Sequence, residues 1–239
     1  MDLTILHTND LHGQLKPELA EKIRLLRERE DALYFDSGDA VSYGNLAIPL
    51  GPDPCWPLLA EAGCHAGVPG NRESHVLLKT FRAKLEGARH PLVCANLFDR
   101  KGELILPASL TLEHKGIKVG VIGVMVPMVT RRMASQAASQ LLWEAPIPHA
   151  KAEAQKLRNE VDLLIALTHI GFKNDQELAA AVPEIDLILG GHSHNVIEDP
   201  VRIGNTFICQ GGSHARFLGK YIWRKDEGLA GAELIKLKS

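Results

Sequence analysis

Short, unbroken runs of Val, Ile and Leu recur along this chain of 239 residues, and longer stretches with helical spacing separate them. A strand that is apolar without alternation is buried on both faces, as in the parallel sheets of α/β proteins. The runs predict strands over residues 3–7, 32–36, 92–95, 118–124, 162–168 and 186–189. Strands and helices that alternate in this way indicate the α/β fold class.

Helices are expected between these strands. Pro17 begins one of them, because proline suits the first helical turn and Leu19, Ile23 and Leu26 then share one face. Two more helices are expected over residues 148–160 and 175–182. After residue 200, Gly-containing turns and short apolar runs predict antiparallel strands that complete a sheet, over residues 201–203, 206–210, 217–223 and 232–237.

Length, charge and cysteine usage limit the classes to which the protein can belong. Without an internal repeat, low-complexity tract or long linker, one domain is expected over residues 1–239. The formal net charge of −2 supplies no basic field, so nucleic acid is not an expected partner. No apolar run approaches the roughly 20 residues of a membrane span, and no export signal is visible, which predicts a cytoplasmic protein without a membrane partner. The four cysteines form no C-x-x-C pair and are expected to be buried thiols.

Polar side chains with metal-binding atoms follow several predicted strands. The segments read HTNDLHG at residues 7–13, DSGD at 36–39, GNRE at 70–73, TH at 168–169 and GGHSH at 190–194. The carboxyl ends of strands are where α/β sheets place ligands. Carboxylate oxygen together with imidazole nitrogen suits manganese, iron, nickel or zinc, and one carboxylate can bridge two such ions about 3.5–4 Å apart.

The order of these five segments resembles that of the calcineurin-like metallophosphoesterases, which carry Asp-x-His, Gly-Asp, Gly-Asn-His-Glu, an isolated His and Gly-His-x-His. HTNDLHG and GGHSH resemble the 5′-nucleotidase branch in particular, and the resemblance covers nearly the whole chain. It implies a four-layer α/β/β/α sandwich with two mixed sheets. It also implies hydrolysis of a small phosphorylated substrate, nucleotides included, by a hydroxide that bridges two divalent transition metals, manganese first among them.

The resemblance also assigns the metal ligands by position. One ion is assigned to Asp10, His12, Asp39 and His194, and the other to Asp39, Asn71, His169 and His192. Asp39 is then the bridging carboxylate. Asp36 is expected to be a structural hydrogen-bonding group. The histidines that match no ligand position are expected to be structural or surface residues, namely His7, His65, His90, His114 and His149.

The third segment departs from the family pattern, because Arg72 stands where the family has a catalytic histidine. A guanidinium gives up no proton at neutral pH but can hold an oxyanion. The first hypothesis is that Arg72, beside Asn71, stabilises the transition state, which favours phosphoanhydrides and aryl phosphates over alkyl esters. The second is that His75 supplies the missing acid. His214 and Arg216 are further candidates for contact with the phosphate.

Other functions stay open at this point. A phosphodiesterase could use the same site, because substrate choice depends on surrounding loops. A metal-binding scaffold with weakened catalysis is the other alternative, because metal ligands also contribute folding free energy. The nucleotidases that the chain resembles usually carry a C-terminal nucleotide-specificity domain, and none is expected within residues 1–239. The oligomeric state is left open.

Overall fold

Two mixed β-sheets form the centre of the computed structural model, which describes residues 2–238. The first sheet has the order β13-β12-β1-β2-β3. Its strands are β1 (Asp2–Thr8), β2 (Leu33–Asp36), β3 (Ala66–Gly67), β12 (Phe217–Arg224) and β13 (Gly228–Lys236). Strands β1, β2 and β3 run parallel, whereas β12 and β13 are antiparallel to their neighbours.

The second sheet has the order β10-β11-β9-β8-β6-β5. Its strands are β5 (Ser109–His114), β6 (Ile117–Met125), β8 (Leu163–His169), β9 (Leu187–Gly190), β10 (Val201–Ile203) and β11 (Thr206–Cys209). The four central strands β6, β8, β9 and β11 are parallel to one another, and antiparallel β5 and β10 form the edges. A separate two-stranded sheet joins β4 (Leu97–Asp99) to β7 (Leu141–Trp143).

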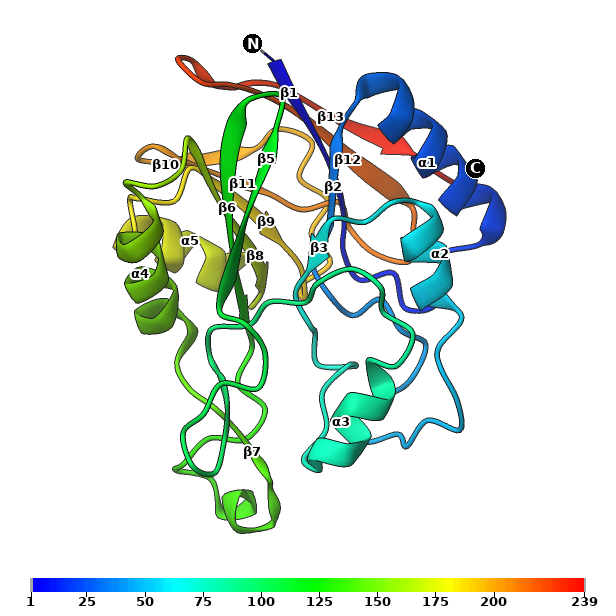
Figure 1. Cartoon of the computed structure of the whole chain (residues 1–239), viewed down its shortest axis with the longest axis vertical. Coiled ribbons are helices and arrows are strands. Elements are labelled where there is room, and N and C mark those ends of the chain that lie inside the picture. Colours follow the sequence, from blue (N-terminus) through cyan, green and yellow to red (C-terminus); the bar gives the residue numbers. More distant parts are fainter. Residues whose placement is uncertain (1, 239) are drawn as a thin grey trace.

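Helices cover the outer face of each large sheet (Figure 1). Helices α1 (Pro17–Glu30) and α2 (Cys55–Glu61) pack on the first sheet, and α4 (Pro146–Leu157) and α5 (Phe172–Ala181) pack on the second. The short elements α3 (Leu78–Lys84) and η1 (Ala134–Ala138) lie with β4 and β7 in the lower part of the view. The predicted four-layer α/β/β/α sandwich is therefore confirmed.

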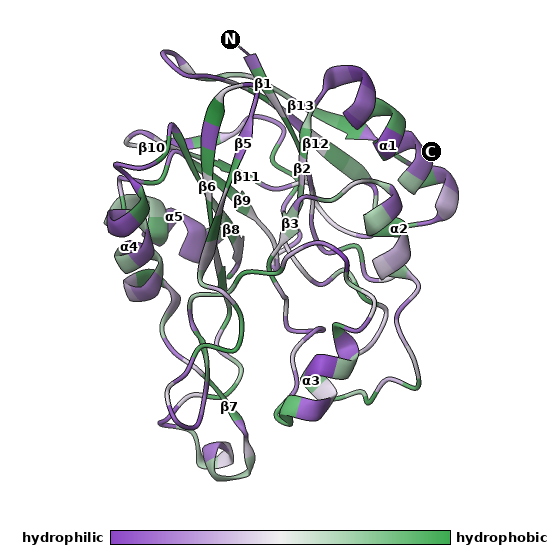
Figure 2. Ribbon diagram, viewed as in Figure 1, coloured by the Kyte–Doolittle hydropathy of each residue, from purple (hydrophilic) through white to green (hydrophobic). Residues whose placement is uncertain are grey.

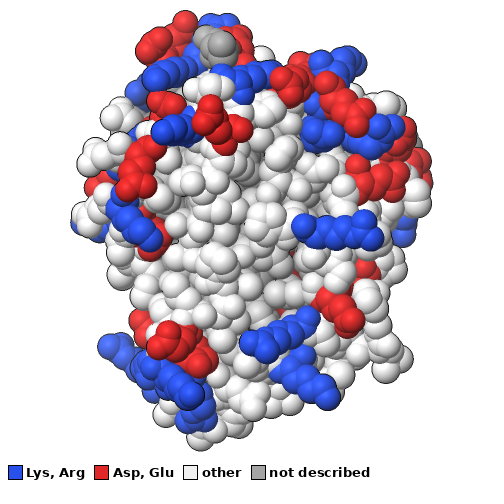
Figure 3. Space-filling view, in the orientation of Figure 1, with Lys and Arg blue, Asp and Glu red and all other residues white. Residues whose placement is uncertain are grey.

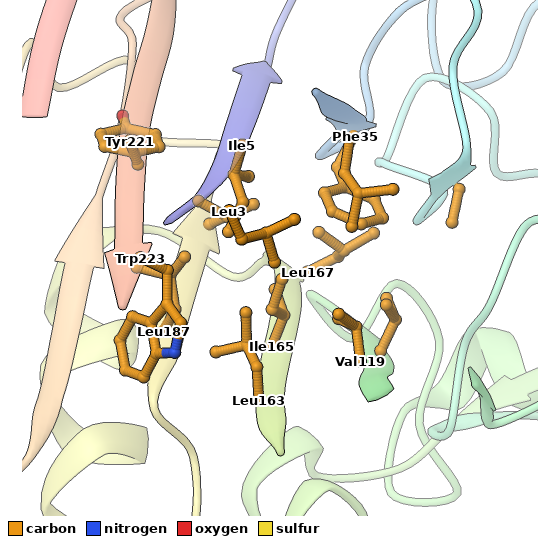
Figure 4. Packing of buried hydrophobic residues seen from close by; sticks show 14 of the residues in the cluster. Leu3, Ile5, Phe35, Val119, Leu163, Ile165, Leu167, Leu187, Tyr221 and Trp223 are labelled. Atoms are coloured by element: carbon orange, nitrogen blue, oxygen red, sulfur yellow. The ribbon is translucent and has the colours of Figure 1, made fainter. Parts of the chain in front are cut away.

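The hydrophobic core between the sheets explains why the strand sequences do not alternate. Leu3 and Ile5 of β1 face Leu163, Ile165 and Leu167 of β8 across the gap between the sheets (Figure 4). The intervening residues of β8, Leu164 and Ala166, pack against α4 and α5 instead. All seven residues of β8 are consequently buried. Figure 2 shows the same division, with apolar colour along the central strands and polar colour on the outer helices.

Two predictions about strands were wrong. Residues 92–95 form no regular strand, because their hydrogen bonds are divided between the sheets: Leu92 makes a single bridge to Gly67, whereas the Ala95 N–H donates to Gly123 O at 2.7 Å. The strands after residue 200 do not complete one sheet either. β10 and β11 extend the second sheet, and β12 and β13 extend the first, with β11 parallel to β9 rather than antiparallel.

The buried thiols and the surface charges agree with the composition. Cys55, Cys94 and Cys209 are buried, as predicted, whereas Cys64 is only partly buried, and all four cysteines are free. On the face shown in Figure 3, basic and acidic groups are interspersed around the rim and do not form a single basic patch. Among residues 2–238, every helix is too short or too polar to cross a bilayer.

His90 gives folding stability a specific pH dependence. It is 7% exposed, and neither ring nitrogen has a hydrogen-bond partner among the described residues. Burial lowers the pKa of His90 to about 4. An unfolded histidine takes up its proton near pH 6.5, so below that pH the unfolded chain binds a proton that the folded chain does not, and stability falls as the pH drops toward about 4.

The His90→Leu variant is expected to lose this part of the pH dependence. The difference between wild type and variant should reach about 3 kcal/mol of unfolding free energy between neutral pH and about pH 4. Urea unfolding of both proteins in a metal chelator measures it, because every other histidine is common to the two. An identical pH dependence in wild type and variant would show that His90 is not buried in its neutral form.

Candidate metal centre

The predicted ligands come together at one edge of the two sheets. Asp10 and His12 follow β1, Asp39 follows β2, and Asn71 follows β3 of the first sheet. From the second sheet, His169 ends β8, and the segment 192–194 follows β9. Because each of these strands lies parallel to a neighbour in its sheet, their carboxyl ends meet where a ligand of an α/β protein is expected. The sequence order of the five segments thus becomes a single spatial cluster.

The first group of ligand atoms surrounds the Asp10 carboxylate. Its Oδ1 lies 3.2 Å from Nε2 of His194 and 3.6 Å from Nε2 of His12. The two imidazole nitrogens are 3.1 Å apart. Three potential ligand atoms from two different sheets therefore converge on one point, which is a suitable arrangement for one cation.

The second group lies between Asp39 and the two histidines of the second sheet. Nε2 of His169 is 3.5 Å from Asp39 Oδ1 and 3.2 Å from Asn71 Oδ1. Nδ1 of His192 lies 2.9 Å from the same Asn71 oxygen. Asp10 also belongs to a group with Asp39 and His169, so in this structure Asp10 is common to both groups. Bridging by Asp39, which the resemblance implies, stays a prediction.

The side chains fit divalent cations for three physical reasons. Oδ1 of Asp10 is buried and accepts no hydrogen bond from the described residues, although buried carboxylate oxygens are normally paired. His169 Nδ1 lies 2.7 Å from the Ser37 carbonyl oxygen and donates to it, which leaves the Nε2 lone pair facing the oxygens of Asp39 and Asn71. The donor set mixes oxygen and nitrogen, as transition metals prefer.

The electrostatics of the cluster also favour positive charge. Burial raises the pKa of Asp10, but the neighbouring imidazoles of His12 and His169 and the hydrogen bond from Asn9 outweigh it and lower the pKa to about 2. Burial lowers the pKa of His169, but the carboxylates of Asp39 and Asp10 outweigh burial and raise it. Each shift has the sign expected of a buried anionic site that holds cations.

Comparison with known proteins agrees with this geometry. The sequence profile of the calcineurin-like phosphoesterases matches residues 3–196, which is most of the chain. The chain belongs to the calcineurin-like phosphoesterase family. An Asp and His cluster at the strand ends is therefore the expected place for the metals of this metallophosphoesterase.

Relatives with curated sequences are longer proteins. An apyrase of Tabanus yao is 30% identical over 91% of this chain and 47% of its own length. A 5′-nucleotidase of Vibrio vulnificus is 27% identical over 97% of this chain and 50% of its own length, and the uncharacterized metallophosphoesterase YunD of Bacillus subtilis is 26% identical over 91% and 49%. This metallophosphoesterase chain spans about half the length of these relatives.

Solved structures share the fold. The 5′-nucleotidase precursor of Thermus thermophilus superposes with a TM-score of 0.80 at 19% identity, covering 99% of this chain and 54% of that one. The calcineurin-like phosphoesterase YfkN of Bacillus subtilis gives a TM-score of 0.78 at 20% identity, covering 99% and 91%. At this identity the comparison shows the architecture of the metallophosphoesterase alone.

The backbone at the ligand positions is unusual. Left-handed φ angles, which residues other than glycine rarely adopt, occur at Asp10 (51°), His12 (50°), Asp39 (52°), His192 (79°) and His194 (57°). Such strain concentrates at functional sites, where the surrounding structure holds it in place. Gly70 matters for a related reason: a Cβ there would collide with the Asp39 carboxylate. No sequence pattern that we used predicted these conformations.

Sequence reasoning missed the buried polar residues that hold the ligands in place. Asn9 donates to Asp10 Oδ2 at 2.8 Å and to Gly212 O at 2.7 Å. The Glu73 carboxylate accepts backbone N–H groups from three residues of the neighbouring loops, Asp39, Val41 and Gly70. Gln210 accepts from the Asn195 N–H and so holds the segment that carries His192 and His194. Glu73 and Asn9 lie within the quoted GNRE and HTNDLHG segments, but no role was predicted for either.

Asp36, His65 and His149 make structural contacts outside the two ligand groups. Asp36 accepts hydrogen bonds from Thr8 Oγ1 at 2.7 Å and from the Gly38 N–H at 3.0 Å, and it belongs to neither ligand group. Burial raises its pKa to about 8. His65 accepts from the Tyr34 N–H, and His149 pairs with Glu144 at 3.0 Å.

Arg72 lies at the candidate centre, whereas His75 points elsewhere. The Arg72 N–H donates to Asp39 Oδ1 at 2.7 Å, and its half-buried guanidinium has Nε 3.9 Å from Asp39 Oδ2. His75 is buried, and its Nδ1 accepts the N–H of Leu77 at 3.0 Å. No hydrogen bond or ion pair joins His75 to a predicted ligand within residues 2–238, so its role as an acid stays a prediction.

His214 lies against the first ligand group. Its ring stacks on His12 with centroids 4.8 Å apart and meets His194 edge-on at 5.9 Å. Its backbone N–H donates to Asp10 O at 2.7 Å. Arg216 is exposed two residues later, and its Nε donates to Ser213 O. His214 is therefore placed at the centre, whereas Arg216 makes no hydrogen bond or ion pair with a predicted ligand within residues 2–238, and contact of either side chain with phosphate stays a prediction.

Proposed function

We propose that the protein is a hydrolase that uses two divalent cations to cleave small phosphorylated substrates, either phosphomonoesters or nucleotides and other phosphoanhydrides. The observation that carries the proposal is the convergence of Asp10, Asp39 and four imidazoles from the ends of strands in two sheets. A site with this donor set suits phosphoryl chemistry. Manganese is the proposed native metal, with iron, nickel and zinc as alternatives.

The residues of the chain have distinct tasks in this proposal. Asp10, His12, Asp39 and His194 would hold one cation, and Asp39, Asn71, His169 and His192 would hold the other, so that Asp39 is shared. Bound cations of this kind polarise a phosphoryl group and lower the pKa of a coordinated water. Arg72 donates hydrogen bonds to a phosphoryl oxygen, because its guanidinium lies beside Asp39 and remains partly exposed. A phosphate is thereby oriented between the cluster and the arginine.

The relatives support the substrate class. Similar proteins carry the names 5′-nucleotidase, apyrase and trifunctional nucleotide phosphoesterase. These names describe proteins about twice as long or longer, so nucleotide specificity for this chain is part of the proposal. His214 and Arg216 are the residues we propose for contact with a second phosphate or with the rest of a nucleotide.

A phosphatase assay with defined metal content tests the proposal. Protein stripped with a chelator and reloaded with manganese is expected to hydrolyse 4-nitrophenyl phosphate and at least one nucleotide, and renewed chelation should abolish the activity. His114→Gln, far from the cluster on the edge strand β5, is the matched control and should keep full activity. Two bound metals without turnover of any phosphate substrate would favour a metal-binding scaffold instead. A higher rate on bis-4-nitrophenyl phosphate than on the monoester would favour a phosphodiesterase.

A further inference from the structure

An exposed apolar loop lies beside the candidate metal centre. Between β2 and α2, the side chains of Leu46, Ile48 and Leu50 are 76%, 68% and 104% exposed, which makes them the most exposed large hydrophobic residues within residues 2–238. Residues 40–52 contain no charged side chain. We call residues 43–50 the apolar loop. Figure 1 shows this segment beside α3, and part of it has apolar colour in Figure 2. Clustered exposed apolar side chains indicate a binding surface.

The backbone of the apolar loop is fixed by a buried lysine. Lys84 of α3 has no exposed surface, and its Nζ donates to the carbonyl oxygens of Gly44 at 2.8 Å and Asn45 at 2.9 Å. The same ammonium donates to Arg72 O at 2.8 Å and Ser74 O at 3.0 Å. One buried cation therefore holds the apolar loop against the loop that carries Asn71 and Arg72.

Side-chain contacts connect the apolar loop directly to the candidate centre. Nδ2 of Asn71 donates to Oδ1 of Asn45 at 3.0 Å, while Oδ1 of Asn71 faces the ligand histidines. Nη1 of Arg72 lies 3.4 Å from Ser42 O. Leu46 therefore follows directly after Asn45, which contacts the predicted metal ligand Asn71.

The base of the loop is closed by hydrogen bonds. Asp53 Oδ2 accepts from both the N–H and the hydroxyl of Ser42, at 2.9 and 2.6 Å, and the Tyr43 hydroxyl donates to Gly51 O. The loop is consequently held by its main chain, whereas its leucine and isoleucine side chains face solvent. A fixed backbone that presents free apolar side chains loses little conformational entropy when a ligand covers them.

We propose that the apolar loop binds an apolar leaving group, so that the preferred substrates are phosphoesters with a sizeable uncharged aryl or alkylaryl group. This inference rests on the proposed function. The neighbourhood of Asn71 and Arg72 favours a substrate over a protein partner as the occupant, because a phosphate held at these residues has the loop at its side. The absence of charge in residues 40–52 favours an uncharged group over a hydrophilic one.

A series of 4-alkylphenyl phosphates separates this binding from the chemical step. The alkyl group changes the apolar area but hardly changes the acidity of the phenol that leaves. We expect kcat/KM to rise about two- to fourfold for each added methylene, because burial of one methylene is worth up to about fourfold. The increase in kcat/KM should come from a lower KM with kcat unchanged, since the interaction is the same in the bound substrate and the transition state.

The triple variant Leu46→Ser, Ile48→Ser, Leu50→Ser is expected to flatten this series. The 4-propylphenyl ester should lose about tenfold more in kcat/KM than phenyl phosphate does, whereas metal content should be nearly unchanged. Leu25→Ser on α1, which is 52% exposed, is the matched control and should keep the wild-type series. An equal dependence of kcat/KM on alkyl chain length in the triple variant and in wild type would overturn the inference.

Binding of phosphonates distinguishes failure of this inference from failure of the proposed function. Calorimetry with 4-alkylbenzylphosphonates needs no turnover, and affinity is expected to rise with chain length in manganese-loaded wild type but not in the triple variant. If that dependence appears in a protein that hydrolyses no phosphate ester, the loop inference holds and the proposed catalysis fails. If phosphates are hydrolysed but chain length affects neither binding nor kcat/KM, the loop inference alone is wrong.

Discussion

Asp39→Asn is expected to remove two-metal binding and to lower phosphatase kcat/KM by at least about 10³-fold, because metal ions contribute several kcal/mol to stabilisation of charge in phosphoryl transfer. The neutral amide keeps an oxygen for the Arg72 N–H, which Asp39 Oδ1 now accepts at 2.7 Å. The fold should therefore survive, and the loss should come from the missing negative charge. Elemental analysis and steady-state kinetics on the same preparation measure both effects.

The Asp36→Asn variant is the control for loss of the Asp39 charge, because Asp36 lies three residues earlier in the same segment. Burial raises the pKa of Asp36 to about 8, so near neutral pH this carboxyl is already mostly protonated and an amide replaces it closely. Metal content and kcat/KM are expected to stay within about threefold of wild type, because single hydrogen bonds contribute modestly. Equal losses of metal content and kcat/KM in the two variants would show that both depend on the intact segment and not on the Asp39 charge.

Among the side chains of the site, Arg72 is expected to make the second largest contribution to phosphatase activity, after Asp39. Removing a single donor to a developing oxyanion typically costs about 10²–10³-fold in kcat, so Arg72→Ala should show a loss of this size on aryl phosphates. Arg72→Lys should recover only part of it, because an ammonium keeps the charge and loses the planar fork of donors. Matched kinetics of the wild type and the two variants on 4-nitrophenyl phosphate provide the measurement.

The dependence on the leaving group tests the chemical role of Arg72. A guanidinium does not protonate the leaving oxygen, so wild type is expected to cleave aryl phosphates and phosphoanhydrides well and alkyl phosphomonoesters poorly. Arg72→His, which supplies a group that can transfer a proton, should narrow this difference. Equal wild-type rates on aryl and alkyl esters would contradict the role given to Arg72. In that case loss of the kcat pH dependence in His75→Ala would identify His75 as the acid.

Strands that are buried on both faces are among the parts of the fold that the sequence predicted. Strand β8 has apolar residues on both sides because one set faces the other sheet and the next set faces α4 and α5. Residues 92–95 have the same apolar composition but bond to both sheets in turn, and composition alone does not reveal that difference. The edge strand β5 was missed because its residues are only partly buried and include Glu113.

The sequence also predicted part of the candidate site. Short motifs at the ends of parallel strands were enough to bring Asp10, Asp39 and His169 into one group, because those strand ends meet at one edge. They could not show that Asp10 lies in both ligand groups, which depends on how its carboxylate is turned. Nor could they identify Asn9 or Gln210, whose hydrogen bonds join segments some 200 and 15 residues apart. Such contacts are fixed by tertiary packing rather than by local sequence.

We propose that two cations bind between the ends of β1, β2, β3, β8 and β9. Anomalous diffraction from crystals grown with manganese tests it most directly, because each ion gives its own peak. We predict two peaks about 3.5–4 Å apart, with the Asp39 carboxylate in contact with both. A single peak, or a pair of peaks that does not contact Asp39, would rule out two cations bridged by the Asp39 carboxylate.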